Sequence, residues 1–302
     1  MNQIALIITA FGAGLLLRHF NVFEESSARF FNRFVIYISL PALVLLKLHD
    51  ISWSSGVAIP ISMAWVHFVV AAIFFISVGK LMKWERETTG ALVLLGGLGN
   101  TSFVGFPLLE TFWGKEHLPT GILIDQLGTF LVLAVVGIPV AAYFGGGARH
   151  DFKELAQRVL KFPPFIALIL ALVLTSLTYP DWLVVTLDRL SGTLLPVALF
   201  SVGLQTKVSR RELREVGSPL AFGLAFKLAI APLLMMTLYM YILGSSDITT
   251  KVTVYLSAMA PMITAGIVAV ENGLNRPLAN LMLGIGIPLS LVTSTIWFYL
   301  LS

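Results

Sequence analysis

One apolar segment of the chain gathers small and polar side chains over residues 96–107. Glycine and proline weaken a helix at such a place, and proline also removes a backbone donor. An interrupted helix exposes free N–H groups at the start of one half and free C=O groups at the end of the other. The N–H end carries a partial positive charge that suits a carboxylate. The residues predicted to contact such an anion are Asn100, Thr101, Ser102, Gly105 and Pro107.

A second apolar segment, residues 251–272, is interrupted at a matching place. Its predicted contact residues are Pro261, Met262, Thr264 and Gly266. Non-helical backbone at membrane depth is tolerated only where it is buried in protein or lines a watery cavity. Interruptions in corresponding places of two halves are typical of a transporter's binding site. The alternative is that these small residues only let helices pack closely.

Ionisable side chains inside apolar segments are costly, and they mark function by default. Lys227 is the only Lys or Arg deep in any such segment, and we expect it to bind the anion. The alternatives for Lys227 are snorkelling to the surface or pairing with a buried carbonyl. His67 lies at nearly the same depth in the other half of the chain. It is a coupling or gating candidate, or else a satisfied buried histidine.

Three carboxylates are further candidates. Asp125 lies towards the outer end of its segment, where it is either interfacial or a coupling proton site. Glu110 and Glu271 end the two interrupted helices. A carboxylate at a helix C-terminus is mildly unfavourable, so we interpret both as pathway or gate residues, with ordinary interfacial charges as the alternative.

The composition requires a membrane environment for these segments. Of the 302 residues, 57% are hydrophobic and only 12% are charged, whereas soluble domains average about 25% charged residues. The net charge of +4 therefore indicates basic loops beside a membrane and not a nucleic-acid partner. Without cysteine, thiolate metal sites and Cys nucleophiles are excluded. The chain has no HExxH, GxGD or GxxxxGK[ST] motif, so we expect no catalytic residue, no metal and no cofactor.

Ten segments reach or approach the length of about 20 apolar residues that a transmembrane helix needs. They are residues 3–18, 31–48, 57–80, 89–112, 119–143, 162–179, 187–205, 218–243, 251–272 and 277–301. The hydrophilic stretch at residues 145–161 is predicted to be a cytoplasmic linker. It separates a first group of five spans, residues 1–144, from a second group, residues 162–302.

An odd number of spans in each half places the second half upside down relative to the first. Residues 88–110 slide by 161 positions onto residues 249–271, which aligns Glu110 with Glu271. Together these features predict an all-α integral membrane protein of ten transmembrane helices in two inverted five-helix repeats. The broken fourth and ninth helices are expected to cross at the bilayer midplane.

The distribution of basic residues predicts the orientation. Of the 20 Lys and Arg residues, fifteen lie in loops on one side and four on the other, and Lys227 lies inside a span. The richer side is predicted to be cytoplasmic, so both termini are extracytoplasmic. We expect a multi-pass protein of the plasma membrane, which in a bacterium is the inner membrane. The pattern leaves the oligomeric state open, with a homodimer among the alternatives.

The segment GNTSFVGFPLL, residues 99–109, resembles the fourth-helix signature of the auxin efflux carrier family. The stretch ENGLNRPLANLMLGIGIPLSLVTSTI, residues 271–296, resembles the same family after its second break. The resemblance implies a scaffold domain of spans 1, 2, 6 and 7 facing a crossover domain, in a fold similar to that of sodium/bile-acid symporters. It also implies transport of auxin in plants, or of malonate or malate in bacteria. The linker of about 20 residues is short, which indicates a bacterial member.

These features predict a secondary active or facilitated transporter of small organic anions, working by alternating access. A sodium- or proton-coupled symporter of bile-acid-like or other solutes on the same fold is the alternative. Sodium is the less expected ion, because the second break, Met259–Gly266, contains no carboxylate. An intramembrane enzyme and a passive channel are the other classes considered.

Overall fold

The computed structural model describes residues 2–23, 25–48, 57–146, 157, 159–175, 177–206 and 210–302. The described chain is all-helical and contains no strand. Six helices are long and apolar enough to cross a membrane. They are Ser27–Leu48, Ala58–Met82, Lys115–Gly145, Asp181–Gln205, Ser218–Ile242 and Arg276–Leu301. Two shorter apolar helices, Ala5–His19 and Pro163–Val173, correspond to the predicted first and sixth spans.

Over its described residues, the first half contains eight α-helices joined by short turns of tighter or wider helix. The α-helices are α1 (Asn2–His19), α2 (Glu25–Phe34), α3 (Leu40–Leu48), α4 (Ala58–Met82), α5 (Arg86–Gly97), α6 (Phe106–Phe112), α7 (Leu118–Leu123) and α8 (Ile138–Gly145). The other turns are η1 (Val35–Ser39), η3 (Thr101–Gly105), η4 (Lys115–His117), η5 (Ile124–Phe130) and η6 (Leu133–Gly137). Most of the predicted linker lies outside the described residues.

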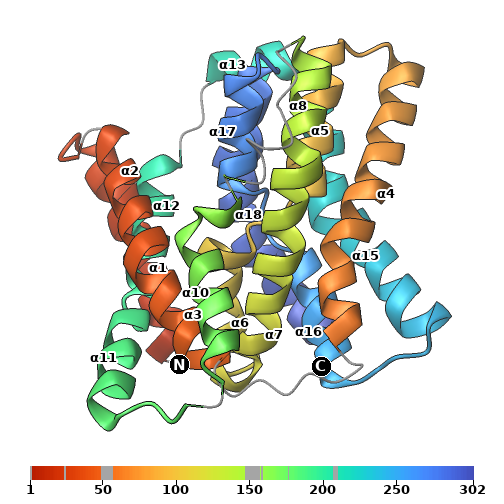
Figure 1. Ribbon diagram of the computed structural model, residues 1–302. Helices are drawn as coiled ribbons and strands as arrows, with labels where there is room; N and C mark the ends of the chain where they lie inside the picture. The colour runs from red at the N-terminus through yellow and green to blue at the C-terminus, as the bar shows by residue number, and fades with distance from the viewer. Residues whose placement is uncertain are drawn as a thin grey trace.

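The second half is also built of helices over its described residues. Its α-helices are α10 (Pro163–Val173), α11 (Asp181–Ser191), α12 (Leu194–Gln205), α13 (Arg210–Val216), α14 (Ser218–Ala225), α15 (Ala231–Met236), α16 (Ile248–Ser257), α17 (Ile263–Glu271) and α18 (Arg276–Leu301). Two wider turns, η7 (Phe226–Ile230) and η8 (Thr237–Ile242), continue α14 and α15. The N- and C-terminal ends lie at the same end of the molecule (Figure 1).

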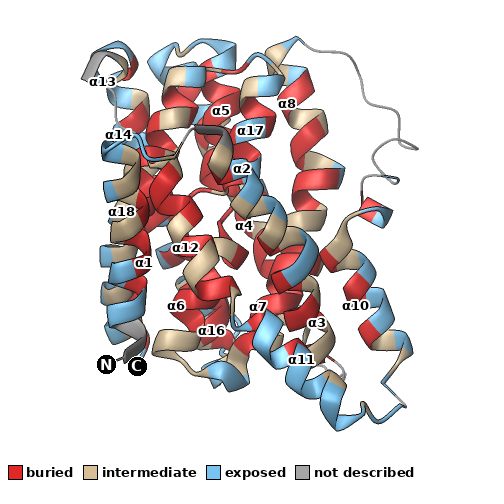
Figure 2. Cartoon of the chain, turned by 90° about the vertical axis from the view of Figure 1, so that its left-hand side faces the viewer, coloured by how far each residue is buried: buried red, intermediate tan, exposed pale blue. Residues whose placement is uncertain are grey.

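Large apolar side chains cover much of the outside of the bundle. Among the exposed ones are Ile73, Val173, Trp182, Tyr241 and Tyr299. Buried residues concentrate in the central helices α5, α6, α16 and α17, whereas α11 is mostly exposed (Figure 2). In water such a surface would be unfavourable, since exposed apolar patches on soluble proteins are small. The distribution is the one expected of a helical bundle whose outer face contacts lipid.

Helices from the two halves pack against each other in pairs. The helix α1 packs along α12, and α3 packs along α10. The first pair meets at Gly14 and Gly203, where a Cβ on either residue would clash with a backbone carbonyl of the other helix. Small residues at such a crossing let two backbones approach closely. This group forms one side of the molecule, beside the interrupted helices (Figure 1).

Both predicted interruptions are present, and they pair with each other. The first lies between α5 and η3 and the second between α16 and α17. Gly99 and Pro261 form an antiparallel bridge. The backbone N–H of Asn100 donates to the Ala260 carbonyl over 2.8 Å, and the N–H of Met262 donates to the Leu98 carbonyl over 3.0 Å. The two non-helical segments therefore satisfy each other's backbone groups.

The interruptions are shorter than the sequence predicts. Gly105 ends η3, Pro107 lies in the first turn of α6, and Gly266 lies inside α17. Pro107 is the second residue of α6, which directly continues η3. Gly266 has a packing role, because a Cβ there would lie 2.6 Å from the Leu283 side chain. These three residues are therefore not part of the open backbone.

Candidate functional site

Asn100 is the polar side chain at the first interruption. It is only 3% exposed. Its Oδ1 accepts hydrogen bonds from the N–H groups of Phe103 at 3.0 Å and Val104 at 3.3 Å, so it caps the half-helix that follows. Its Nδ2 is buried and has no hydrogen-bond partner among the described residues. Leaving a buried donor unpaired costs about 1–3 kcal/mol. This donor is therefore unused within the described chain.

A buried polar cluster of Thr101, Asp125 and Gln126 lies beside Asn100. The Thr101 hydroxyl donates to Asp125 Oδ1 over 2.6 Å, and Gln126 Nε2 donates to Asp125 Oδ2 over 2.7 Å. Asp125 is 4% exposed and is therefore buried within the protein. Within the described chain the Gln126 Oε1 atom is buried without a partner. Gln126 was not among the predicted residues, although a polar residue next to Asp125 in an apolar segment was a usable signal.

Lys227 lies at the second interruption. Its side chain is fully buried, and its Nζ donates to the carbonyl of Ser257, the last residue of α16, over 3.2 Å. A Cβ on Gly99 would lie 3.3 Å from the same Nζ. The structure thus excludes snorkelling and shows the buried carbonyl partner. A cation at the C-terminal end of a helix interacts favourably with its dipole.

His67 occupies the corresponding place in the first half. Its Nε2 is 3.0 Å from the carbonyl of Gly96, in the last turn of α5. Each base therefore contacts the end of the half-helix that leads into the interruption of its own half. His67, Lys227 and Thr101 also line one small cavity of about 10 Å³, a volume close to that of one water probe. The structure thus brings together the predicted basic residues and the first interruption.

The remaining predicted residues are distributed around this centre. Ser102 is buried, Met262 is half-buried and Thr264 is exposed. Glu110 pairs with Lys115 at 3.5 Å, and Glu271 is exposed at the end of α17. The two glutamates thus lie apart from the crossing. No group of three or more His, Asp or Glu residues in the described chain could hold a metal ion.

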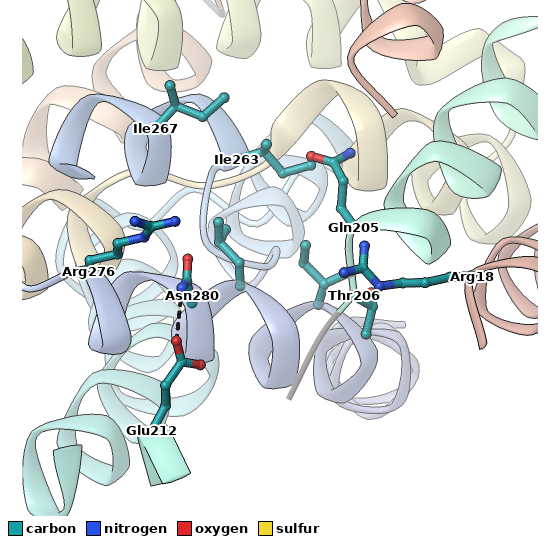
Figure 3. A pocket seen from close by; sticks show the side chains of 10 residues that line it. Arg18, Gln205, Thr206, Glu212, Ile263, Ile267, Arg276 and Asn280 are labelled. Carbon is teal, nitrogen blue, oxygen red and sulfur yellow. Dashed lines mark hydrogen bonds between the residues drawn. The ribbon is translucent and has the colours of Figure 1, made fainter. Parts of the chain in front are cut away.

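Two larger cavities border the crossing. A cavity of about 370 Å³ lies near the C-terminal end of α1 and includes Arg18 and Ile263 (Figure 3). A cavity of about 180 Å³ lies near the beginning of α1 and includes Leu6 and Phe106. The first reaches α17, which begins after the second interruption, and the second reaches α6, which continues η3 after the first interruption. Both interrupted helices are thus accessible from a cavity.

An all-helical bundle with an apolar exterior and two paired helix interruptions defines a membrane transport protein. Comparison with known proteins agrees. A sequence model of a family described as membrane transport protein, the auxin efflux carrier family, matches residues 1–144 and 152–298. The chain belongs to this family, so the resemblance of residues 99–109 is confirmed. The chain is a transporter and not an enzyme.

The chain is also similar to three transporters that are described as uncharacterized. A protein of Methanothermobacter thermautotrophicus is 27% identical over 288 residues, covering 94% of this chain and 92% of the relative. One from Methanocaldococcus jannaschii is 28% identical over 213 residues, covering 68% of each. The transporter YfdV of Escherichia coli is 22% identical over 300 residues, covering 94% of this chain and 93% of YfdV. The similarity extends over both halves.

Proposed function

We propose that the chain carries small organic anions, carboxylates such as malonate or malate or auxin-like acids, across the membrane by alternating access. The anion binds where the two interrupted helices cross. The observation that carries this proposal is the Asn100 Nδ2 donor, which is buried and without a partner in the described chain. It lies at the start of a half-helix, where free N–H groups favour a negative charge.

The charge at the crossing also favours an anion. The starts of the two second half-helices, at Thr101 and Ile263, are brought together by the paired backbone. Each helix start supplies only about half a unit of positive charge. The buried Lys227 side chain beside Gly99 adds a basic group. Groups from both halves would thus offset the cost of removing a carboxylate from water.

The proposed architecture is two inverted repeats of five spans, residues 1–144 and 162–302. Reciprocal packing supports it. The helix α4 packs against α16 of the other half, and α14 packs against α5. His67 and Lys227 contact equivalent half-helix ends. In this arrangement α1–α3 and α10–α12 form a scaffold, past which the crossover helices move.

We further propose a multi-pass protein of the plasma membrane, the bacterial inner membrane, with both termini extracytoplasmic. The two termini at one end of the molecule (Figure 1) support an even number of spans. The excess of Lys and Arg on one side sets the direction. A homodimer is the proposed assembly to test by the mass of the purified protein in detergent.

The test is a thermal-shift screen of purified protein against acetate, malonate, malate and indole-3-acetate, followed by uptake into proteoliposomes. A ligand at 100 times its Kd stabilises the folded state by about 2.7 kcal/mol, which is measurable as a rise in Tm. We expect at least one carboxylate to raise Tm and to show saturable uptake. If none of the four does either, the chain is not a carrier of such anions.

The buried polar cluster of Thr101, Asp125 and Gln126 favours a second candidate function, a proton- or sodium-coupled symporter. Asp125 receives two hydrogen bonds, and the neighbouring Gln126 Oε1 is a buried acceptor with no partner in the described residues. Such oxygens suit a proton or a hard cation. The same screen with and without sodium, at two pH values, distinguishes coupling from uniport. Concentrative uptake of bile-acid-like or other solutes that requires either ion would favour this candidate.

A further inference from the structure

The larger of the two cavities lies between helices of the proposed scaffold and helices of the proposed crossover domain. Its walls come from α1 and α12 on one side and from α17 and α18 on the other (Figure 3). It contains Ile263, the first residue of α17, which directly follows the second interruption. With about 370 Å³ it falls in the size range of small-molecule sites. It therefore connects the crossing with the end of the molecule predicted to be cytoplasmic.

Two arginines occupy opposite walls of this cavity. Arg18 projects from α1 and Arg276 from the first position of α18 (Figure 3). The Arg18 guanidinium donates to the Leu204 carbonyl over 2.5 Å. Among the residues that the structure describes, Arg276 has no hydrogen-bond or ion-pair partner. The acidic lining residue Glu212 accepts a hydrogen bond from Asn280 over 3.1 Å. Positive charge thus exceeds negative charge in the lining.

The smaller cavity at the other end differs at the equivalent basic residue. The offset of 161 positions that aligns the two halves places Lys115 opposite Arg276, and Glu110 opposite Glu271. Lys115 lines the smaller cavity, where it pairs with Glu110 at 3.5 Å. Within the described chain Arg276 and Glu271 form no such pair. The basic residue is thus engaged at the smaller cavity and available at the larger one.

We infer that the larger cavity is a second binding site, an inner vestibule in which Arg276, with Arg18 on the opposite wall, binds a small dicarboxylate such as malonate. Guanidinium groups bind carboxylates in a two-pronged geometry. The lining also includes Ile263, Ile267 and Leu283, which suit a short apolar chain between two carboxylates. This inference rests on the proposed anion transport, and it adds a docking step between the crossing and the cytoplasm.

The test uses a single reporter thiol, because the chain has no cysteine of its own. Ile267→Cys places a thiol in the cavity at a position that is 46% exposed. We expect an anionic methanethiosulfonate to react about tenfold faster than its cationic analogue, because a positive cleft concentrates anions. Millimolar malonate should slow the reaction. Adding Arg276→Gln should bring the ratio of the two rates close to one and abolish the protection.

The control is Arg214→Gln, because Arg214 is exposed on α13 and is not part of the cavity lining. It should leave the rate ratio and the protection unchanged. Arg18→Lys keeps the charge but loses the two-pronged geometry, so it should weaken protection and preserve the ratio. If Arg276→Gln leaves both ratio and protection as they were, the inference is overturned.

Two further outcomes separate this inference from its alternatives. Protection by nanodiscs rich in phosphatidylglycerol, with none by malonate, would assign the arginines to a lipid headgroup and overturn the vestibule. Saturable malonate uptake without protection at Ile267→Cys would retain the proposed function and reject this site. Protection without any carboxylate uptake would support the site as an anion-binding cavity and reject the proposed transport.

Discussion

The two interruptions pair with each other through the same kind of backbone hydrogen bond, yet their side chains differ in polarity. At the first, Asn100 caps a half-helix, and Thr101 bonds to the buried Asp125. At the second, residues 258–262 are Ala, Met, Ala, Pro and Met, and α17 begins without a side-chain cap among the described residues. The first half therefore supplies the polar side chains of the crossing, and the second supplies mainly backbone.

Each half also places one basic residue at the crossing, and the stronger base is in the second half. His67 contacts the end of α5 in the first half, and Lys227 contacts the end of α16 in the second. Lysine carries a full charge at neutral pH when it is unperturbed, whereas histidine titrates near it. The buried Asn100 amide and the buried Lys227 side chain thus come from different halves. Substitutions at each break should consequently affect different properties of transport.

The largest expected effect is at Asn100. Asn100→Ala removes the cap and the unpaired Nδ2 donor, and losing one buried hydrogen-bond partner costs about 1–3 kcal/mol. We expect kcat/KM for uptake to fall about 5- to 150-fold. Asn100→Ser keeps an oxygen acceptor for the cap, so it should restore thermal stability without restoring uptake. Near-normal uptake by well-expressed Asn100→Ala would show that the first break is only structural.

Lys227 should have the next largest effect. Lys227→Gln removes the charge and keeps much of the volume. We expect KM for an anion to rise about tenfold, which corresponds to the lower end of the roughly 1.5–3 kcal/mol that a hydrogen bond to a charged group contributes. The voltage dependence of transport should also change. Lys227→Met separates transport from folding, because replacing a buried charge by an apolar residue is often neutral or stabilising. Transport like wild type at every voltage would make Lys227 a structural lysine.

A smaller effect is expected at Thr101. Thr101→Val keeps the shape of the side chain and removes the donor to Asp125 Oδ1, while the bond from Gln126 remains. The loss of about 1 kcal/mol should lower uptake about fivefold. Thr101→Ser restores a hydroxyl and should recover most of it. If Thr101→Ser does not recover uptake, the site requires the methyl group and not the hydrogen bond.

Much of this arrangement was predictable from the sequence because its signals are local. Apolar stretches predicted the helices, and glycine with proline predicted both interruptions. The depth of Lys227 and His67 followed from their places in those stretches. That each of the ten predicted segments crosses a bilayer stays a prediction, since six helices meet the length and hydropathy expected of a span.

Other features depended on packing and could not be found this way. Gly105, Pro107 and Gly266 were assigned to open backbone, but they lie in helices. Composition does not distinguish a glycine that breaks a helix from one that admits a neighbouring side chain. Asp125 and Gln126 were not recognised as a buried pair, because their burial comes from the fold around the first break. Arg276 was counted only as a loop residue, since the cavity it lines is formed with α1, α12, α13 and α17.

The smallest effect should be at Thr264, in the first turn of α17, just as Thr101 lies in the first turn of the half-helix after the first interruption. Thr264 is exposed, and exposed substitutions usually change stability by no more than about 0.5 kcal/mol. Thr264→Val should therefore alter uptake by less than about twofold, measured beside Thr101→Val in the same proteoliposomes. The two substitutions are chemically identical, so their ratio measures the polarity difference between the breaks directly. Equal losses at the two positions would mean that the second break also contacts the solute through a side chain. The solute would then be bound by hydroxyl groups from both halves, and Asn100 would not be the main side-chain contact.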